Sequence, residues 1–335
     1  MTESDALLAT LRQQAEGATQ LNLAFIGVAN GLFDALAAEA GSPEGLAARL
    51  GYDPAYLRRW CDAAYAFGLL DGEDDALHPS PMGALYRSGQ PGWAMAAGGA
   101  LSAHMAERVV GLMRTGERPG EALLEEKASI AALFGPMLEQ GFTPMLGGPV
   151  LRSVPVFEEL LQNDALVIDL GCGNGWYLRV LAQRFPALRG LGIDGMAENI
   201  DGATASAEAA GLSARLRFLR GDVLSLGPTE PATLIAMNRA LHHVWDRQSD
   251  VMAAIFDRLK PGGAAVIWEP AWPADPRSLR PEGRPGITWN NILEHAQGNH
   301  LLRPDEIAAA AAAAGLVPTI HPVGFDVVVV ARRPA

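Results

Sequence analysis

A glycine-rich segment has the residue types and spacing of a binding loop. It reads Asp169-Leu-Gly171-Cys-Gly173-Asn-Gly175 and leads into the helical stretch WYLRVLAQRF. Glycines allow tight turns and close approach of a ligand to the backbone, and the start of the following helix offers unpaired amides to a polar or anionic group. The dinucleotide fingerprint requires glycine where Trp176 stands, which argues against NAD.

Two carboxylates follow at positions that suit a nucleoside. Asp194 ends the second strand-like run, 25 positions after Asp169, where a carboxylate can accept hydrogen bonds from both hydroxyls of a ribose. Asp222 ends the third run, where it can reach an adenine amino group. Because the glycine segment and both acidic residues fall in register, we favour a ligand-binding role over separate turn-forming or capping roles.

Three histidines could activate an acceptor. His242 and His243 follow the fourth strand-like run in NRALHHVWD, and His295 lies in WNNILEHAQGNH. An unperturbed imidazole titrates near physiological pH and can act as a general base. Two neutral imidazoles from separate elements can instead hold Fe or Zn with positions left open for substrate. Chelation of adjacent ketone and carboxylate oxygens would then make the neighbouring carbon a nucleophile.

The elements that must position these residues form an α/β pattern from about residue 164. Five short apolar runs are separated by helices of suitable length: ALVIDL, GLGID, RLRFLRGD, TLIAMN and AAVIWE. This order predicts a doubly wound, Rossmann-like parallel sheet. LVPTIHPV and DVVVVARR predict a closing antiparallel hairpin. We assign residues 161–335 to this domain.

The preceding chain is helical in pattern. Residues 1–90 combine short helices with a turn segment, ALHPSPMGALYRSG, and predict a winged-helix-like domain. Residues 91–160 are predicted to be a helical connector and a wall of the substrate pocket. A winged helix invites a DNA-binding hypothesis, but residues 1–90 hold five basic and twelve acidic residues, a net charge of −7.

Composition narrows the class of protein. The chain has 335 residues, 49% of them apolar, and a net charge of −12, which excludes a wholly disordered chain and argues against partners with phosphate-rich surfaces. We therefore expect a small-molecule substrate, no nucleic acid and no membrane. Cys61 and Cys172 do not form a CxxC pair, and the N-terminal residues lack the features of a signal peptide. A cytoplasmic location is the expectation.

The motifs VIDLGCGNG, GIDGM, RGDVL and LKPGGAAVIWEP resemble those of class I S-adenosylmethionine-dependent methyltransferases. The resemblance implies that S-adenosylmethionine is the cofactor. It places Asp169 towards the amino group of the cofactor, Asp194 on the ribose and Asp222 at the adenine. The full set of cofactor-binding residues that it implies is Asp169, Gly171, Gly173, Gly175, Asp194, Gly221, Asp222, Val223 and Asn238.

The N-terminal segments LFDALA, GLAARLGYDPAYLRRW, FGLLDG and LHPSPMGALYRSG resemble the dimerising winged-helix region of small-molecule O-methyltransferases. This implies a homodimer formed through the N-terminal domain. In that family a segment similar to LHDWxD supplies a histidine base, which by position would be His242, although His243 replaces the acidic residue. One expectation is therefore O-methylation of a phenolic or carboxylic metabolite.

The two histidine positions also resemble a smaller subgroup, the metal-dependent 2-oxo acid C3-methyltransferases of the phenylpyruvate C-methyltransferase type. His243 and His295, 52 positions apart, match its metal ligands, and Lys127 stands for the basic residue that holds the substrate carboxylate. His242 would assist proton removal. Metal-assisted C-methylation next to the ketone of a 2-oxo acid, with one Fe or Zn ion, is our leading hypothesis. O-methylation and a metabolite-sensing winged-helix regulator are its alternatives.

Overall fold

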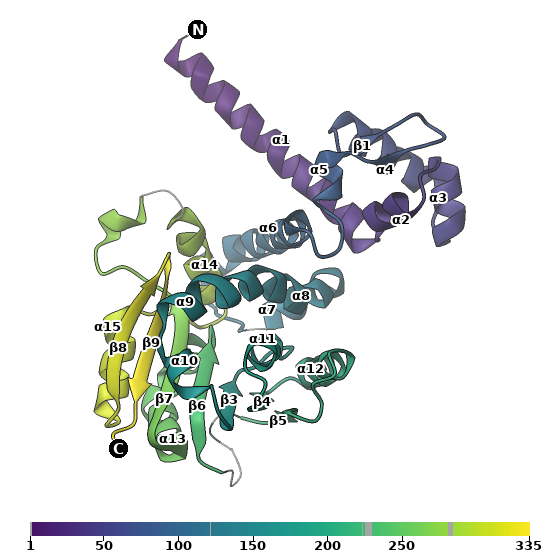
Figure 1. Cartoon of the computed structure of the whole chain (residues 1–335). Helices are drawn as coiled ribbons and strands as arrows, with labels where there is room; N and C mark the ends of the chain where they lie inside the picture. Colours follow the sequence, from purple (N-terminus) through teal and green to yellow (C-terminus); the bar gives the residue numbers. More distant parts are fainter. Residues whose placement is uncertain (1, 121, 223, 225–229, 281–283) are drawn as a thin grey trace. The chain divides into compact units, whose positions relative to one another are not determined.

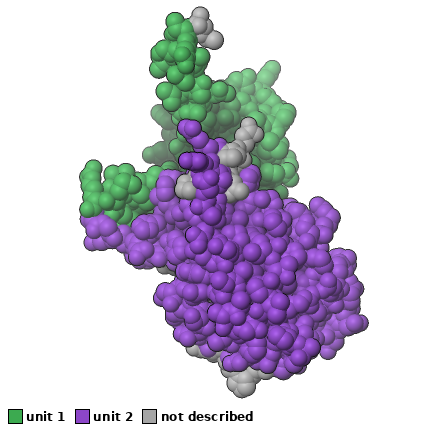
Figure 2. Space-filling model, turned by 90° about the vertical axis from the view of Figure 1, so that its left-hand side faces the viewer, with its two compact units in different colours: residues 1–114, 123–141 green, residues 115–122, 142–335 purple. Residues whose placement is uncertain are grey.

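The computed structural model describes residues 2–120, 122–222, 224, 230–280 and 284–335. The chain divides into two compact units (Figure 2). The first contains residues 1–114 and 123–141, and the second contains residues 115–122 and 142–335. Among the described residues no single helix has the length and apolarity needed to cross a membrane. The helices Glu3–Ala29 and Leu32–Ala38, which are bent by 67° at their junction, meet this requirement only as a pair and only by length and composition.

The first unit is built from helices and one short hairpin. Its elements, together with the helices that lead into the second unit, are α1 (Glu3–Ala29), α2 (Leu32–Ala38), α3 (Pro43–Leu50), α4 (Pro54–Ala66), β1 (Leu70–Asp71), β2 (His78–Pro79), α5 (Pro81–Ala84), α6 (Pro91–Thr115), α7 (Ala122–Glu125) and α8 (Ala128–Met145). Ser42 and Asp53 cap α3 and α4 by accepting hydrogen bonds from backbone amides of the first turn. Phe33 packs on the edge of Trp60 at 5.4 Å in the core of this unit.

The second unit alternates strands and helices (Figure 1). Its strands are β3 (Ala165–Leu170), β4 (Leu188–Asp194), β5 (Leu216–Arg220), β6 (Ala232–Asn238), β7 (Leu259–Pro270), β8 (Val317–Val323) and β9 (Asp326–Arg332). Its helical elements are η1 (Leu146–Val150), α9 (Leu151–Ser153), α10 (Val156–Leu160), α11 (Trp176–Arg184), α12 (Ala197–Ala209), η2 (Leu241–Arg247), α13 (Gln248–Arg258), η3 (Pro276–Leu279), α14 (Arg284–Ala296) and α15 (Pro304–Ala313).

The strands form one sheet in the order β5-β4-β3-β6-β7-β9-β8. Strands β3 to β7 are parallel to one another, whereas β9 runs antiparallel to both β7 and β8. This confirms the predicted Rossmann-like sheet with a closing hairpin. The order of β3, β4 and β6 changes direction at β3, which is where open α/β sheets bind ligands beyond the carboxyl ends of their strands.

Both faces of the sheet are covered by apolar packing, as a parallel sheet requires. One face packs against α11 through Leu178 and Leu181 and includes Trp268 of β7. The other packs against α13 and α15 through Ile255 and Ile307. Side chains alternate between the faces along each strand, so neighbouring residues at a strand end serve different faces.

Candidate active site

The glycine-rich loop between β3 and α11 has the backbone that its sequence predicts. Gly171, Gly173 and Gly175 all have positive φ, at 75°, 51° and 74°. A Cβ at Gly171 would lie 2.7 Å from the Cβ of Ala240, and one at Gly175 would lie 2.6 Å from the ring of Phe218. Larger residues are therefore excluded at both positions by conformation and by space. Nothing lies within 4 Å of a Cβ built on Gly173, so the loop is open there.

Asp194 ties this loop to the end of β4. Its Oδ2 accepts a hydrogen bond from the amide of Gly173 at 2.9 Å. Its Oδ1 accepts from the amide of Met196 and from the side chain of Asn199, each at 3.0 Å. The carboxylate is thus held in one orientation beside the loop. Both lone pairs of Oδ1 are used, whereas Oδ2 keeps one for a further donor, which suits the predicted contact with the ribose.

The Asp169 carboxylate lies at the carboxyl end of β3 and is 1% exposed. Its Oδ1 accepts a hydrogen bond from Asn238 Nδ2 at 3.0 Å. Burial raises the pKa of Asp169 to about 7, against the lowering effect of the Asn238 hydrogen bond. The other amide atom, Asn238 Oδ1, is buried and has no hydrogen-bond partner. Two predicted cofactor residues therefore meet in one buried polar centre.

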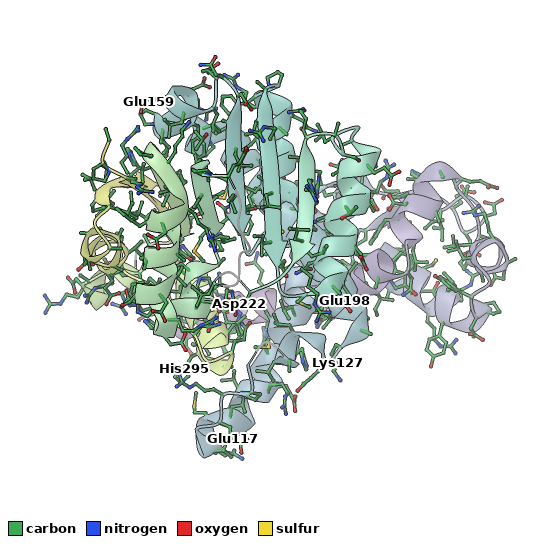
Figure 3. The ribbon with its side chains drawn as sticks, turned by 90° about the horizontal axis from the view of Figure 1, so that it is seen from below. Glu117, Lys127, Glu159, Glu198, Asp222 and His295 are labelled. Carbon is green, nitrogen blue, oxygen red and sulfur yellow. The ribbon has the colours of Figure 1, made fainter. Side chains whose placement is uncertain are left out.

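Asp222 follows β5 at the carboxyl edge of the sheet (Figure 3). Its side chain is exposed, accepts a hydrogen bond from the amide of Leu224 at 2.8 Å and pairs with Arg247 at 3.2 Å. The Leu224 amide first, and Arg247 after it, lower the pKa of the carboxyl. The amide of Gly221 donates to the carbonyl of Asp194 at 2.9 Å, which brings this segment next to the ribose candidate. Val223 lies outside the described residues.

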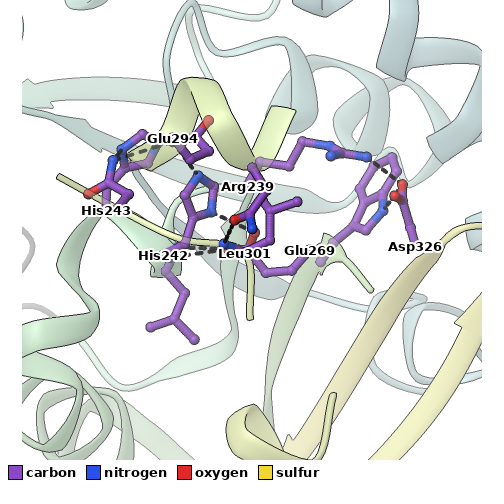
Figure 4. A network of polar contacts seen from close by, with 11 residues as sticks. Arg239, His242, His243, Glu269, Glu294, Leu301 and Asp326 are labelled. Atoms are coloured by element: carbon purple, nitrogen blue, oxygen red, sulfur yellow. Dashed lines mark hydrogen bonds and ion pairs between the residues drawn. The ribbon is translucent and has the colours of Figure 1, made fainter. Parts of the chain in front are cut away.

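His242 and Glu269 form a buried pair (Figure 4). Glu269 Oε2 is 2.7 Å from His242 Nδ1, and Glu269 Oε1 accepts from the amide of Leu241 at 2.9 Å. Burial alone would lower the pKa of His242, but the charge and hydrogen bond of Glu269 outweigh burial and raise it. The pair fixes the imidazole and leaves Nε2 to face Glu294, whose Oε2 lies 3.5 Å away.

His242, His243 and Glu294 could hold a metal ion together. Each offers one ligand atom, and the three atoms all lie within 4.8 Å of one another. The rings of His242 and His243 are 4.2 Å apart, and Asn299 Nδ2 lies 2.9 Å from His243 Nδ1. Two imidazole nitrogens and one carboxylate are a donor set that Zn and non-haem Fe accept. The residues therefore fit such an ion.

This cluster shares only His243 with the predicted metal pair, and the predicted role of His295 as a metal ligand stays a prediction. His295 is exposed on α14 (Figure 3) and does not belong to this cluster, whereas the residue before it does. Successive residues of an α-helix point about 100° apart, so a helix that turns Glu294 towards His242 turns His295 away. The three-ligand set among the described residues is His242, His243 and Glu294.

Lys127 is exposed at the turn before α8, in the residues 123–141 of the first unit. The histidines belong to the second unit. The proposed contact of Lys127 with a substrate carboxylate stays a prediction.

Sequence reasoning missed Arg239. It is the one described residue other than glycine with a positive φ, at 52°. Its guanidinium lies 4.1 Å from the ring centre of Phe142 and pairs with Asp326, which also accepts from Trp268 Nε1 at 2.9 Å. A left-handed conformation costs a side-chain-bearing residue on the order of 1–2 kcal/mol. The ion pair and the aromatic contacts stabilise this strained backbone, which lies between β6 and the two histidines.

Residues 167–263 match the family model described as a methyltransferase domain. A trans-aconitate 2-methyltransferase from Streptomyces avermitilis is 35% identical over 121 residues, which are 36% of this chain and 44% of that protein. The chain spans about half the length of the curated relatives that it matches, from 38% to 52%.

Solved structures match along the whole chain. An O-methyltransferase family protein from Burkholderia thailandensis has a TM-score of 0.75 at 22% identity, with 100% of this chain and 99% of that chain covered. Human N-acetylserotonin methyltransferase in complex with S-adenosylmethionine has a TM-score of 0.75 at 18% identity, with both chains covered completely. At these identities the likeness establishes the fold. Residues 167–263 therefore match a methyltransferase domain, and the chain has the fold of these solved methyltransferase structures.

Proposed function

We propose that the protein transfers a methyl group from S-adenosylmethionine to a hydroxyl oxygen of a small molecule, with His242 as the general base. The observation that carries this proposal is the buried pair of His242, which lies in η2 after β6, and Glu269 of β7, with His242 Nδ1 2.7 Å from Glu269 Oε2. The names of two similar proteins refer to small acceptor molecules, trans-aconitate in one case and N-acetylserotonin in the other. A phenol or a carboxylic acid is the acceptor class that we propose.

The residues at the loop fit the cofactor. Gly173 is open to a ligand, Asp194 keeps free acceptor capacity, and Asn238 Oδ1 is buried without a partner. When bound, S-adenosylmethionine supplies a methyl group on a sulfonium, which reacts by in-line substitution. The protein must therefore align the acceptor oxygen and remove its proton.

The contacts of His242 determine which of its ring nitrogens can remove the proton of the acceptor. Glu269 occupies Nδ1, so Nε2 is the nitrogen of His242 that accepts the proton, and it does so from the neutral imidazole. Because the pKa of His242 is raised to about 10, we expect turnover to increase as the pH rises towards that value. The charge of Glu269 stabilises the imidazolium that results, in the manner of a buried carboxylate that orients a histidine base. Glu269 also accepts from the amide of Leu241 at 2.9 Å, which fixes the carboxylate against the backbone that carries His242.

A second candidate is metal-assisted C-methylation of a 2-oxo acid. The observation that favours it is the cluster of His242, His243 and Glu294, with ligand atoms within 4.8 Å of one another. An ion held there would polarise a ketone and stabilise the enolate of the substrate. The carboxylate of Glu269 on Nδ1 of His242 is also the usual outer partner of a metal-binding histidine.

One experiment separates the two candidates. Labelled S-adenosylmethionine is incubated with the protein and with phenols, carboxylic acids and 2-oxo acids, in parallel with and without a chelator. We expect methyl ethers or esters, turnover that resists the chelator, and loss of turnover in Glu269→Gln but not in the exposed Glu198→Gln. Chelator-sensitive methylation of carbon in 2-oxo acids would replace the first candidate by the second, and no methylated product with any acceptor would refute both.

The regulator hypothesis finds little support in the side chains of the first unit. A DNA-binding winged helix needs free basic residues on its recognition helix. Arg58 of α4 pairs with both Glu44 and Asp74. Arg59 donates to the carbonyl of Ala55 at 2.9 Å. A salt-dependent DNA retention assay would test this alternative directly.

A further inference from the structure

Arg239 forms the turn between β6 and the helix η2, which carries His242. Its φ of 52° is a left-handed conformation that glycine adopts without cost and that a residue with a Cβ adopts only under strain. Its amide donates to the carbonyl of Trp268 at 2.8 Å, so the turn begins against β7. Because glycine would give the same turn without strain, the contacts of the arginine side chain must compensate for it.

The guanidinium of Arg239 is anchored on strand β9 (Figure 4). It pairs with Asp326, the first residue of β9, and lies 4.1 Å from the ring centre of Phe142. The side chains of the pair are largely shielded from water, at 22% exposed for Arg239 and 6% for Asp326. Trp268 Nε1 donates to the same carboxylate oxygen at 2.9 Å, which fixes its position. Removal of either partner would leave the other charge poorly compensated.

The segment 239–242 is attached at its other end to Glu269. Glu269 Oε1 accepts from the amide of Leu241 at 2.9 Å, and Glu269 Oε2 lies 2.7 Å from His242 Nδ1. Trp268 and Glu269 are neighbours in β7 and point to opposite faces of the sheet. The segment therefore connects the two faces at the carboxyl edge, and both of its ends must be held for the imidazole to keep its direction.

The same turn packs against the cofactor loop. A Cβ built on Gly171 would lie 2.7 Å from the Cβ of Ala240, so little space separates residue 240 from the loop. Movement of the turn towards the loop is blocked by this contact. A turn that loses its anchor on β9 would shift on the side of η2, where the histidine lies.

We propose that Arg239 and Asp326 are positioning residues whose ion pair holds the turn after β6, so that His242 keeps its contact with Glu269 and presents Nε2 to the acceptor. Neither residue exchanges a proton with the substrate. The role of the pair in turnover rests on the proposed function, in which His242 is the base. Neither residue was among those predicted from sequence.

Two variants of the full chain test the role of the pair. Arg239→Gly keeps the left-handed turn and removes the guanidinium, and Asp326→Asn removes the charge but keeps an oxygen for the indole of Trp268. The control is Asp164→Asn, which removes an ion pair with Arg189 at 2.9 Å. That pair is exposed and lies at the amino ends of β3 and β4, away from the carboxyl edge that carries the site.

The first readout needs no acceptor. The Nδ1 proton of His242 is observed by NMR with isotope-labelled histidine and is assigned by its absence in His242→Gln. A buried imidazole N–H that is bonded to a carboxylate exchanges slowly with water. We expect exchange at least about tenfold faster in Arg239→Gly and in Asp326→Asn, because the contact with Glu269 opens more often, and no change in the control.

The second readout separates positioning from a general loss of structure. The kcat for methyl transfer should fall at least about tenfold in both variants, since a small displacement of a catalytic group is costly. The KM for S-adenosylmethionine and the affinity for S-adenosylhomocysteine should stay within about twofold of wild type.

Unchanged exchange of the imidazole proton in both variants would overturn the inference. An equal effect in the control, or a loss of cofactor affinity as large as the loss in kcat, would also overturn it, because the pair would then act on the whole domain or on the cofactor. The same holds if neither variant folds while the control does. If the wild type methylates no acceptor, the proposed function fails, and the exchange of the imidazole proton still decides whether the pair positions His242.

Discussion

Replacing Asp169 by asparagine should make the ligand-free protein more stable at neutral and alkaline pH and should weaken its binding of the cofactor. Asp169 is 1% exposed, and burial raises its pKa from 3.8 to about 7. Asparagine keeps an oxygen that can accept the hydrogen bond from Asn238, and it removes the buried charge. The substitution therefore isolates the free-energy cost of burying that charge.

The sign and size of the effect follow from linkage. A carboxyl whose pKa is higher in the folded state contributes stability that is complete below its unfolded pKa and is lost as the pH rises through the folded value. The rise of the Asp169 pKa from 3.8 to about 7 corresponds to about 4 kcal/mol at pH 8 and to less than half of that at pH 5. Asp169→Asn should recover most of this difference at pH 8.

Chemical denaturation of the wild type and the variant at pH 5 and pH 8 measures the effect, with the exposed Asp201→Asn as control. Calorimetry with S-adenosylhomocysteine in buffers of different ionisation enthalpy measures the second half of the prediction: wild type should release close to one proton on binding at pH 6, and the variant none. An Asp169→Asn protein that is less stable than wild type at pH 8, or wild-type binding without proton release, would refute the reasoning.

Further outcomes are expected at the acceptor side and in the first unit. Glu269→Gln should lower methyl transfer by about 100-fold or more while S-adenosylhomocysteine still binds as in wild type, because the amide no longer stabilises the imidazolium; product formation and calorimetry check the two halves. If the second candidate holds, metal analysis should find one ion per chain that is lost in His243→Ala and Glu294→Ala and kept in His295→Ala, and loss in His295→Ala would contradict the assigned ligand set. We also propose that the exposed Leu7 and Leu11 of α1 support a homodimer, so Leu7→Glu with Leu11→Glu should halve the mass seen by light scattering; an unchanged mass would count against this interface.

The sheet and the cofactor loop could be predicted because their signals are local. Glycines at alternate positions after an apolar strand require a backbone that few other residues adopt, and the structure gives all three a positive φ. The closing hairpin could also be predicted, because two apolar runs flank Gly324. The acidic residue at position 194 lies at a strand end, where its neighbours in space are set by the parallel register.

The acceptor side was harder to predict because it depends on how separate elements are oriented. The pattern WNNILEHAQGNH marks a helix, but its rotation about the axis decides whether residue 294 or 295 faces His242. The positive φ at position 239 could not be predicted, because the residue there is arginine and not glycine. The position of Glu269 near His242 could be predicted in part, because the apolar run AAVIWE ends at Glu269 and forms the strand beside β6, which precedes His242. The contact at 2.7 Å follows only from the packed structure.

Two consecutive residues of strand β7 contribute to opposite faces of the sheet. Trp268 pairs in register with Asn238 and packs on the face that carries Asp169, whereas Glu269 points the other way and meets His242. A single-residue insertion in β7 ahead of position 268 would exchange indole and carboxylate between the two faces. Donor binding and acceptor activation would then be lost together, so directed evolution of this protein should tolerate length changes in its loops far better than in this strand.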